Sequence, residues 1–227
     1  MAEPHLILFD CDGTIVDSEG LIIEAMKRAF DDEGLEAPEP AAIRRIIGLS
    51  LPLAVAHLGA PSDEDIIMNV SEAYRQRYSY LRDKEGMEEP LFDGMHQLIT
   101  ELGSRDEYIL GIATGKTMKG VDNLLNANQL THMFHTIQTS DKAPSKPNPA
   151  MIFQALSETG IAPERTVMIG DTTFDIEMAN NAKVGAIGVT WGHHEAKDLA
   201  AHSPRFLIDE IADLKSTIEA SFSPQLT

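Results

Sequence analysis

Cysteine is nearly absent from this chain of 227 residues, since Cys11 is its only one. A single thiol excludes an intrachain disulfide and a cysteine-based zinc site, and it fits a reducing compartment. Long hydrophobic runs are also missing, because no stretch approaches the ~18 apolar residues of a membrane span. The four apolar residues that precede Asp10 are too few for a signal peptide. We therefore expect a cytoplasmic protein that does not act at a membrane.

Positive charge is scarce too, since 18 lysine and arginine residues face 36 aspartate and glutamate residues, for a formal net charge of −18. So acidic a chain is repelled by phosphodiester backbones and anionic membranes, which makes nucleic acid a poor partner. The remaining composition, with 43% hydrophobic and 24% charged residues, is that of a globular protein. The length favours one domain with a substantial insertion.

Three short apolar runs each end in a residue that can do polar chemistry. The runs cover residues 6–9, 108–113 and 167–170, and they lead to Asp10, Thr114 and Asp171. Such runs are typical of strands buried on both faces, as in a parallel sheet. Further strands are expected at 134–138, 185–189 and 206–208, and helices at 95–102, 117–127, 149–159 and 174–181. This alternation predicts an α/β fold with a doubly wound, Rossmann-like parallel sheet, which binds ligands at the carboxyl ends of its strands.

The stretch from residue 18 to residue 90 has a different pattern, with no convincing strand. Its apolar spacing predicts four helices, at 19–33, 40–47, 51–58 and 63–84. We therefore expect a small helical cap domain at 18–90, inserted after the first strand into a catalytic core of residues 1–17 and 91–227. The chain from Ser221 onward is expected to be frayed.

The segment Asp10-Cys11-Asp12-Gly13-Thr14 places two carboxylates at the end of the first strand. One carboxylate can attack a substrate while the other transfers protons, and a carboxylate nucleophile that forms an aspartyl-phosphate is a known route for phosphoryl transfer. Gly13 allows the backbone to turn and leave both side chains accessible. A polar turn that caps a strand is the alternative interpretation of this segment.

A second acidic pair, Asp171 and Asp175, follows a later strand. If these residues lie beside Asp10 on adjacent strand ends, their like charges repel strongly unless a cation is bound. Ligation by carboxylates, water and a substrate phosphate suits Mg²⁺ far better than Zn²⁺. Alternatively, the pair belongs only to a helix cap with acidic residues in its first turn.

Two further segments could hold phosphate. Lys146 lies between Ser145 and Pro147 in Ser-Lys-Pro-Asn-Pro, where prolines restrict the backbone and the ammonium could balance an aspartate cluster. Thr114-Gly115-Lys116 offers a hydroxyl and backbone N–H groups near a helix start. The alternatives are a solvated lysine and a plain strand-to-helix turn.

These four segments, in this order, resemble those of the haloacid dehalogenase superfamily of phosphohydrolases, in particular the group of the phosphoglycolate phosphatases. The resemblance covers residues 10–175. It implies that Asp10 is the nucleophile and Asp12 the general acid and base. It also implies that Thr114 and Lys146 hold the phosphate of a small-molecule ester.

The same resemblance implies a Mg²⁺ site formed by Asp10, Asp171 and the carbonyl oxygen of Asp12, supported by Asp175. It further implies that the cap occupies the long gap between the first two segments. The expected protein is a Mg²⁺-dependent phosphatase that acts through an aspartyl-phosphate, as a monomer or homodimer.

Other activities of the superfamily fit less well. Dehalogenases and phosphonatases lack the second aspartate, which is present here as Asp12. Phosphomutases carry a histidine ten residues after it, where this sequence has Ile22. A pyrophosphatase or nucleotidase on the same core stays open, and a binding protein without turnover is disfavoured because every motif carboxylate is intact.

Two pairs of residues outside these segments invite interpretation. In the expected helix at 40–47, Arg44 and Arg45 lie off the apolar face, either as surface residues or with one of them pairing with a carboxylate of the leaving group. His193 and His194 could suggest a metal pair, but a loop at the sheet edge is the preferred interpretation.

Overall fold

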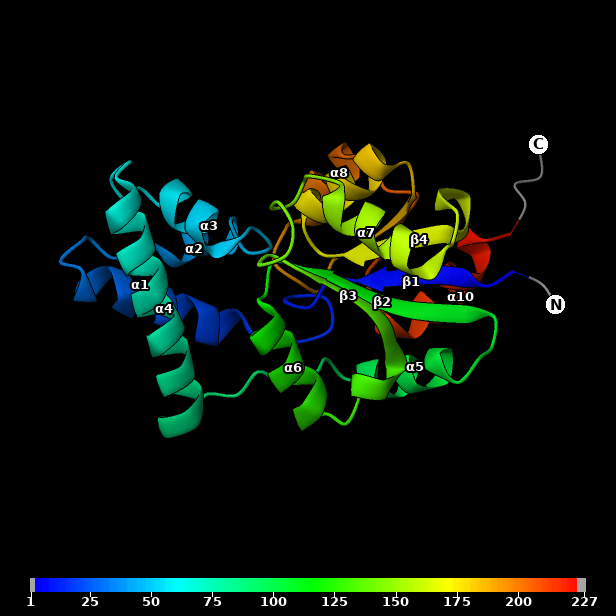
Figure 1. The fold of residues 1–227 in the computed structure, drawn as a ribbon, viewed down its shortest axis with the longest axis horizontal. Helices are drawn as coiled ribbons and strands as arrows, with labels where there is room; N and C mark the ends of the chain where they lie inside the picture. The colour runs from blue at the N-terminus through cyan, green and yellow to red at the C-terminus, as the bar shows by residue number, and fades with distance from the viewer. Residues whose placement is uncertain (1–2, 224–227) are drawn as a thin grey trace.

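The computed structural model describes residues 3–223 and contains one sheet of six parallel strands, in the order β3-β2-β1-β4-β5-β6 (Figure 1). The strands are β1 (His5–Phe9), β2 (Tyr108–Thr114), β3 (Phe134–Thr139), β4 (Thr166–Gly170), β5 (Gly185–Val189) and β6 (Phe206–Ile208). All six predicted strands are therefore confirmed, and so is the doubly wound α/β fold.

Two groups of helices cover the two faces of the sheet. They are α5 (Met95–Gly103), α6 (Met118–Ala127) and α10 (Ile211–Ser221) on one face, and α7 (Ala150–Thr159), α8 (Thr173–Ala182) and α9 (Ala196–Ala201) on the other. Alternation along β1 explains the two layers, since Ile7 and Phe9 join one apolar cluster while Leu6 and Leu8 join the other. Short 3-10 turns at Thr131–Met133 and Pro163–Arg165 precede β3 and β4.

The segment between β1 and α5 is helical throughout its regular structure. It contains α1 (Glu19–Asp32), α2 (Pro40–Arg44), α3 (Leu51–His57) and α4 (Glu64–Lys84), which lie together at one end of the sheet (Figure 1). These helices share an apolar cluster of their own, which includes Met26, Phe30, Ile43 and Val70. The N–H of Asp17 donates to Pro90 O at 2.8 Å, so the chain leaves and rejoins the sheet at neighbouring points.

Three details differ from the predictions. The helix expected at 40–47 ends at Arg44, because a turn follows and Gly48 has a φ of 100°. The helices α9 and α10 were not predicted, although the apolar spacing of α10 could have indicated it. The prediction that the chain is frayed from Ser221 onward is wrong for its first residues, since Ser221 is buried and the Phe222 ring stacks on His5 with centroids 4.0 Å apart. Residues 224–227 lie outside the described residues.

Among residues 3–223, no helix is both long enough and apolar enough to cross a membrane.

The central strand should dominate stability. Leu8→Ala removes a fully buried side chain from β1 and should lower the free energy of unfolding by about 2–5 kcal/mol. Leu207→Ala in the edge strand β6 is the matched control; this side chain is 37% exposed, and its loss should cost about 1 kcal/mol or less. Urea unfolding followed by circular dichroism measures both. Equal losses would contradict the assignment of β1 to the core.

Candidate active site

The carboxyl ends of β2, β1 and β4 lie side by side, and each one carries a polar side chain into the same place. Asp10 follows β1, Thr114 ends β2 and Asp171 follows β4. The Asp10 N–H donates to Ile169 O at 2.9 Å, which continues the pairing of β1 with β4 as far as the site. These three side chains, predicted to meet at this edge, are buried together.

The chain turns sharply after Asp10. Gly13 has a φ of 79°, and a Cβ atom there would lie 2.2 Å from both Asp171 Oδ2 and His193 Nδ1. Glycine is therefore required at this position for conformation and for space. The turn brings the Thr14 hydroxyl to Asp171, where Oγ1 donates to Oδ1 at 2.8 Å.

Lys146 lies buried between two carboxylates. Its Nζ is 2.9 Å from Asp10 Oδ1 and 2.6 Å from Asp175 Oδ1. Burial alone would lower the pKa of this ammonium, but the charges of Asp10 and Asp175 outweigh it and raise the pKa above its usual value. Lys146 is therefore a cation inside the site and not a solvated lysine.

Asp175 is held by the start of its own helix. The Thr172 N–H donates to Asp175 Oδ2 at 3.1 Å as part of a capping box, and the Thr172 hydroxyl donates to the same oxygen at 2.6 Å. A Cβ atom on Gly170 would lie 2.2 Å from the carboxyl carbon of Asp175, so the glycine at the end of β4 makes room for it. Asp175 therefore caps its helix through Oδ2 and contacts Lys146 in the candidate site through Oδ1.

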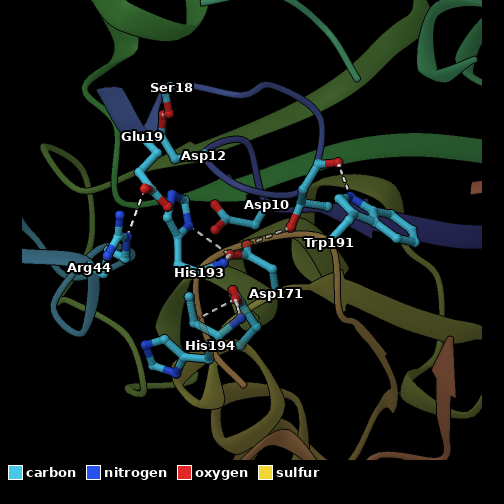
Figure 2. A network of polar contacts seen from close by, with 12 residues as sticks. Asp10, Asp12, Ser18, Glu19, Arg44, Asp171, Trp191, His193 and His194 are labelled. Carbon is cyan, nitrogen blue, oxygen red and sulfur yellow. Dashed lines mark hydrogen bonds and ion pairs between the residues drawn. The ribbon is translucent and has the colours of Figure 1, made fainter. Parts of the chain in front are cut away.

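His193 is a site residue that the sequence analysis missed. It does lie in the loop after β5, as expected of the His193-His194 pair, but its side chain is only 2% exposed and contacts Asp171 (Figure 2). Its backbone N–H and its Nδ1 each lie 2.8 Å from Asp171 Oδ2. Gly192 was the available signal, because a Cβ atom there would lie 2.3 Å from the same oxygen.

Asp171 and His193 are in hydrogen-bond contact, and each shifts the pKa of the other. Burial would raise the pKa of Asp171, but the hydrogen bonds and charge of His193 hold it below its usual value. Burial would lower the pKa of His193, but its hydrogen bond to Asp171 and the charge of that carboxylate raise it. Asp171 is therefore an ionised carboxylate despite its full burial.

Asp12 faces away from this cluster, toward the helical segment. Its Oδ1 accepts a hydrogen bond from the Ser18 hydroxyl at 2.5 Å and lies 2.7 Å from Lys116 Nζ. The same ammonium lies 3.2 Å from Glu89 Oε2 and 3.1 Å from the Tyr78 hydroxyl. The Lys116 side chain, predicted to belong to a phosphate-binding turn, thus joins Asp12 to the chain segments that enter and leave the helices.

The carboxylates of Asp10, Asp171 and Asp175 could hold a metal ion. Each offers an oxygen, and these atoms all lie within 4.8 Å of one another. Burial raises the pKa of Asp10 to about 7, with the charges of Asp175 and Asp171 adding to it and Lys146 opposing it. Among residues 3–223, no group donates a well-oriented hydrogen bond to Asp10. A buried oxygen cluster with this unsatisfied carboxylate fits a divalent cation such as Mg²⁺.

The loop of residues 45–50, here called the cap loop, touches the core beside the site. The Ser50 N–H donates to Ser145 Oγ at 2.8 Å, next to Lys146. A Cβ atom on Gly115 would lie 2.8 Å from the carbonyl oxygens of both Gly48 and Leu49. The missing side chain of Gly115 therefore permits this contact, in addition to the role predicted for it in the phosphate-binding turn.

His194 connects the same loop to the opposite side of the site. Its Nδ1 accepts from the Thr173 N–H at 3.1 Å, and its Nε2 lies 3.3 Å from Arg45 O, so the ring bridges α8 and the cap loop. Arg44 lies near it and pairs with Glu19 at 2.7 Å, with both side chains partly exposed (Figure 2). Recognition of a substrate carboxylate by Arg44 or Arg45 stays a prediction.

Comparison with known proteins gives consistent results. The model of the family described as haloacid dehalogenase-like hydrolase matches residues 7–189. The chain is 34% identical to "Probable phosphatase IndB" of Dickeya dadantii, over 95% of this chain and 94% of that protein. It is 25% identical to a phosphoglycolate phosphatase of Nitrosococcus oceani, over 96% and 98%. It is also 28% identical to the pyrophosphatase PpaX of Bacillus mycoides, over 92% and 94%.

Solved structures share the whole fold. A haloacid dehalogenase-like family hydrolase of Streptococcus pneumoniae superimposes with a TM-score of 0.80 at 30% identity, over 96% of this chain and 99% of that one. The crystal structure of "a predicted phosphatase from Clostridium acetobutylicum" gives a TM-score of 0.84 at 23% identity, over 96% of this chain and 100% of that one, which shows the fold alone.

Mg²⁺ should stabilise the folded protein, because it relieves repulsion among buried carboxylates that are dispersed on unfolding. A concentration of about 100 times the dissociation constant adds about 2.7 kcal/mol, which for a chain of this size raises the melting temperature by about 5–10 °C. Asp171→Asn should lose most of this shift, while Asp106→Asn at an exposed position should keep it. Differential scanning fluorimetry with Mg²⁺ and with EDTA measures the shift. An equal shift in all three proteins would place the ion elsewhere.

Proposed function

The chain belongs to the haloacid dehalogenase-like hydrolase family, and we propose that it is a Mg²⁺-dependent phosphatase that hydrolyses a small-molecule phosphate monoester, in the manner of the phosphoglycolate phosphatases. The family match and its phosphatase relatives identify the chain as a hydrolase that acts on phosphate esters. Metal dependence, the monoester substrate and the roles of individual residues are parts of the proposal. A cytoplasmic location and a monomeric or homodimeric state belong to it as well.

Asp10 supplies the nucleophile. Its carboxylate is 1% exposed, and its Oδ2 accepts no hydrogen bond from any residue of the described part of the chain. An oxygen in this situation can attack phosphorus, which forms an aspartyl-phosphate on Asp10 and breaks the bond to the leaving-group oxygen. This unpartnered carboxylate oxygen beside a buried ammonium is the observation that carries the proposal.

Asp12 handles the protons. It gives a proton to the leaving-group oxygen in the first step and takes one from the water that hydrolyses the aspartyl-phosphate in the second. Ser18 and Lys116 both contact Oδ1, which leaves Oδ2 for the transferred proton. The Lys116 side chain thereby orients Asp12, a role that adds to the one suggested by its place in the phosphate-binding turn.

The negative charge of the phosphoryl group needs compensation in a site that already holds several carboxylates. Lys146 supplies a buried cation next to Asp10, and Thr114 and Gly115 supply the hydroxyl and the close backbone approach. A Mg²⁺ ion held by Asp10, Asp171 and the Asp12 carbonyl, with support from Asp175, would neutralise the phosphoryl oxygens when bound.

Residues 18–90 act as the cap over this site. The contacts of the cap loop with Gly115, Ser145 and His194 correspond to a closed arrangement, in which bulk water has little access to Asp10. Exclusion of water until the leaving group has departed favours attack by Asp10 over direct hydrolysis.

Removal of the nucleophile should abolish turnover without unfolding the protein. Asp10→Asn is nearly isosteric but a poor nucleophile, and kcat should fall by about 10⁴-fold or more. Phosphate release from p-nitrophenyl phosphate with Mg²⁺ measures it, and the melting temperature shows whether the fold is retained. Asp17→Asn, at an exposed neighbouring position, is the matched control and should retain full activity. More than a few per cent of activity in Asp10→Asn would exclude Asp10 as the nucleophile.

Cap closure makes a separate prediction for Gly115. In Gly115→Ala the new methyl group overlaps the carbonyl oxygens of Gly48 and Leu49, so the closed arrangement becomes less favourable. An overlap of about 1–3 kcal/mol should lower kcat/KM by about 5- to 150-fold. Trypsin should also cleave faster after Arg45, since an open cap exposes its loop.

The control for this substitution is Gly20→Ala, because a Cβ atom on Gly20 meets nothing within 4 Å. That variant should keep the activity and the trypsin sensitivity of the natural protein. If Gly115→Ala loses activity while trypsin sensitivity is unchanged, the role of Gly115 is confined to phosphate binding and the closure argument fails.

A further inference from the structure

A cavity of about 220 Å³ opens from Asp12 between the helical segment and the start of α6. Most of its wall is apolar and comes from α1, α4 and the cap loop, through Ile22, Met26, Ile47, Leu49, Tyr74 and Tyr78. Asp12 lines this cavity. In the proposed mechanism, the leaving group that Asp12 protonates therefore lies in the cavity.

The polar groups at the inner end of the cavity are already engaged with one another. Lys116 contacts Asp12 and Glu89, and the Tyr78 hydroxyl donates to Glu89 at 2.6 Å. Two carboxylates therefore share one ammonium. A leaving group with a carboxylate of its own would bring a third negative charge next to them, at a place where the Lys116 ammonium is already shared by Asp12 and Glu89.

The other cations that line the cavity are more exposed to solvent than Lys116. Arg75 and Arg82 keep 40% and 28% of their side-chain surface exposed and pair with Glu72 and Asp83, and Lys119 is exposed. Arg44, which the sequence offered as a partner for a substrate carboxylate, pairs with Glu19 and is not part of the cavity wall.

We propose that this cavity selects phosphate monoesters whose leaving group is apolar, carries no carboxylate and is about as large as one six-membered ring. The inference rests on the proposed phosphatase function and names the substrate class within it. The size follows from the volume, since an apolar cavity of about 150 Å³ in another protein holds benzene. The present cavity is larger by about the volume of a linking methylene group and a ring substituent.

The affinity comes from removing apolar surface from water. Burial of each methylene-sized group is expected to favour the larger ester by about fourfold. Burial of a ring against Ile47, Leu49 and Tyr74 should therefore raise kcat/KM at least tenfold above that of the ester of a two-carbon alcohol.

Three esters of similar intrinsic reactivity test the proposal: benzyl phosphate, ethyl phosphate and phosphoglycolate, each of which is the ester of a primary alcohol. Phosphate release with Mg²⁺ gives kcat/KM for each. We expect benzyl phosphate to exceed ethyl phosphate by about tenfold or more, and ethyl phosphate to equal or exceed phosphoglycolate. Cyclohexylmethyl phosphate should match benzyl phosphate within a few fold, since the selection is for apolar size.

A filled cavity should remove this preference. Ala54→Leu places a larger side chain in the cavity wall and should lower kcat/KM for benzyl phosphate by about tenfold, while ethyl phosphate is turned over as before. Ala56→Leu, an exposed position of the same helix, is the matched control and should change neither value. Turnover of ethyl phosphate and the melting temperature show that Ala54→Leu is folded.

The outcomes separate the two levels of the argument. Phosphoglycolate or pyrophosphate as a better substrate than benzyl phosphate would overturn the apolar leaving group and leave the phosphatase function standing. An equal loss on both esters in Ala54→Leu would likewise overturn it. No phosphate release from any ester would overturn the proposed function, and the inference with it.

Discussion

Three carboxylates are crowded into a volume from which water is nearly excluded, and a single lysine lies among them. Asp10, Asp171 and Asp175 offer oxygens within 4.8 Å of one another, and all three are almost fully buried. Like charges at this separation repel strongly at the low effective dielectric of a protein interior. Lys146 between Asp10 and Asp175, and His193 against Asp171, offset part of that repulsion. Oδ2 of Asp10 has no hydrogen-bond partner among the described residues, and in the proposed function this is the oxygen that receives the phosphoryl group.

This crowding depends on backbone positions without side chains. A Cβ atom on Gly13, Gly170 or Gly192 would lie 2.2 to 2.3 Å from Asp171 or Asp175, so the strand ends can approach the carboxylates only because these residues are glycines. The parallel sheet supplies the other half of the geometry, since β2, β1 and β4 are neighbours and end at the same edge. The rigid apolar layers on both faces then hold the carboxylates in place against their mutual repulsion.

The helical segment contacts the core next to Asp12. Lys116 belongs to the core, yet its ammonium lies between Asp12 and Glu89, and Tyr78 of α4 completes the contact. The position of the helical segment is thereby linked to the orientation of the Asp12 carboxylate. Asp12 also lines the apolar cavity, so in the proposed mechanism the group that Asp12 protonates is the group that the cavity selects.

Short-range patterns in the sequence were enough to predict the sheet, most of the helices and the carboxylates at the strand ends. Buried parallel strands appear in the sequence as continuous apolar runs. Asp10 and Asp171 stand directly after two of these strands, with Asp12 and Asp175 a few residues further on, so their proximity follows from the topology. The position of His193 could not be predicted in this way, because the loop of residues 190–195 after β5 can place its side chains in many directions. The second role of Gly115 and the apolar cavity depend on which cap residues meet which core loops across about a hundred positions of sequence. Only tertiary packing decides those contacts, since no local periodicity encodes them.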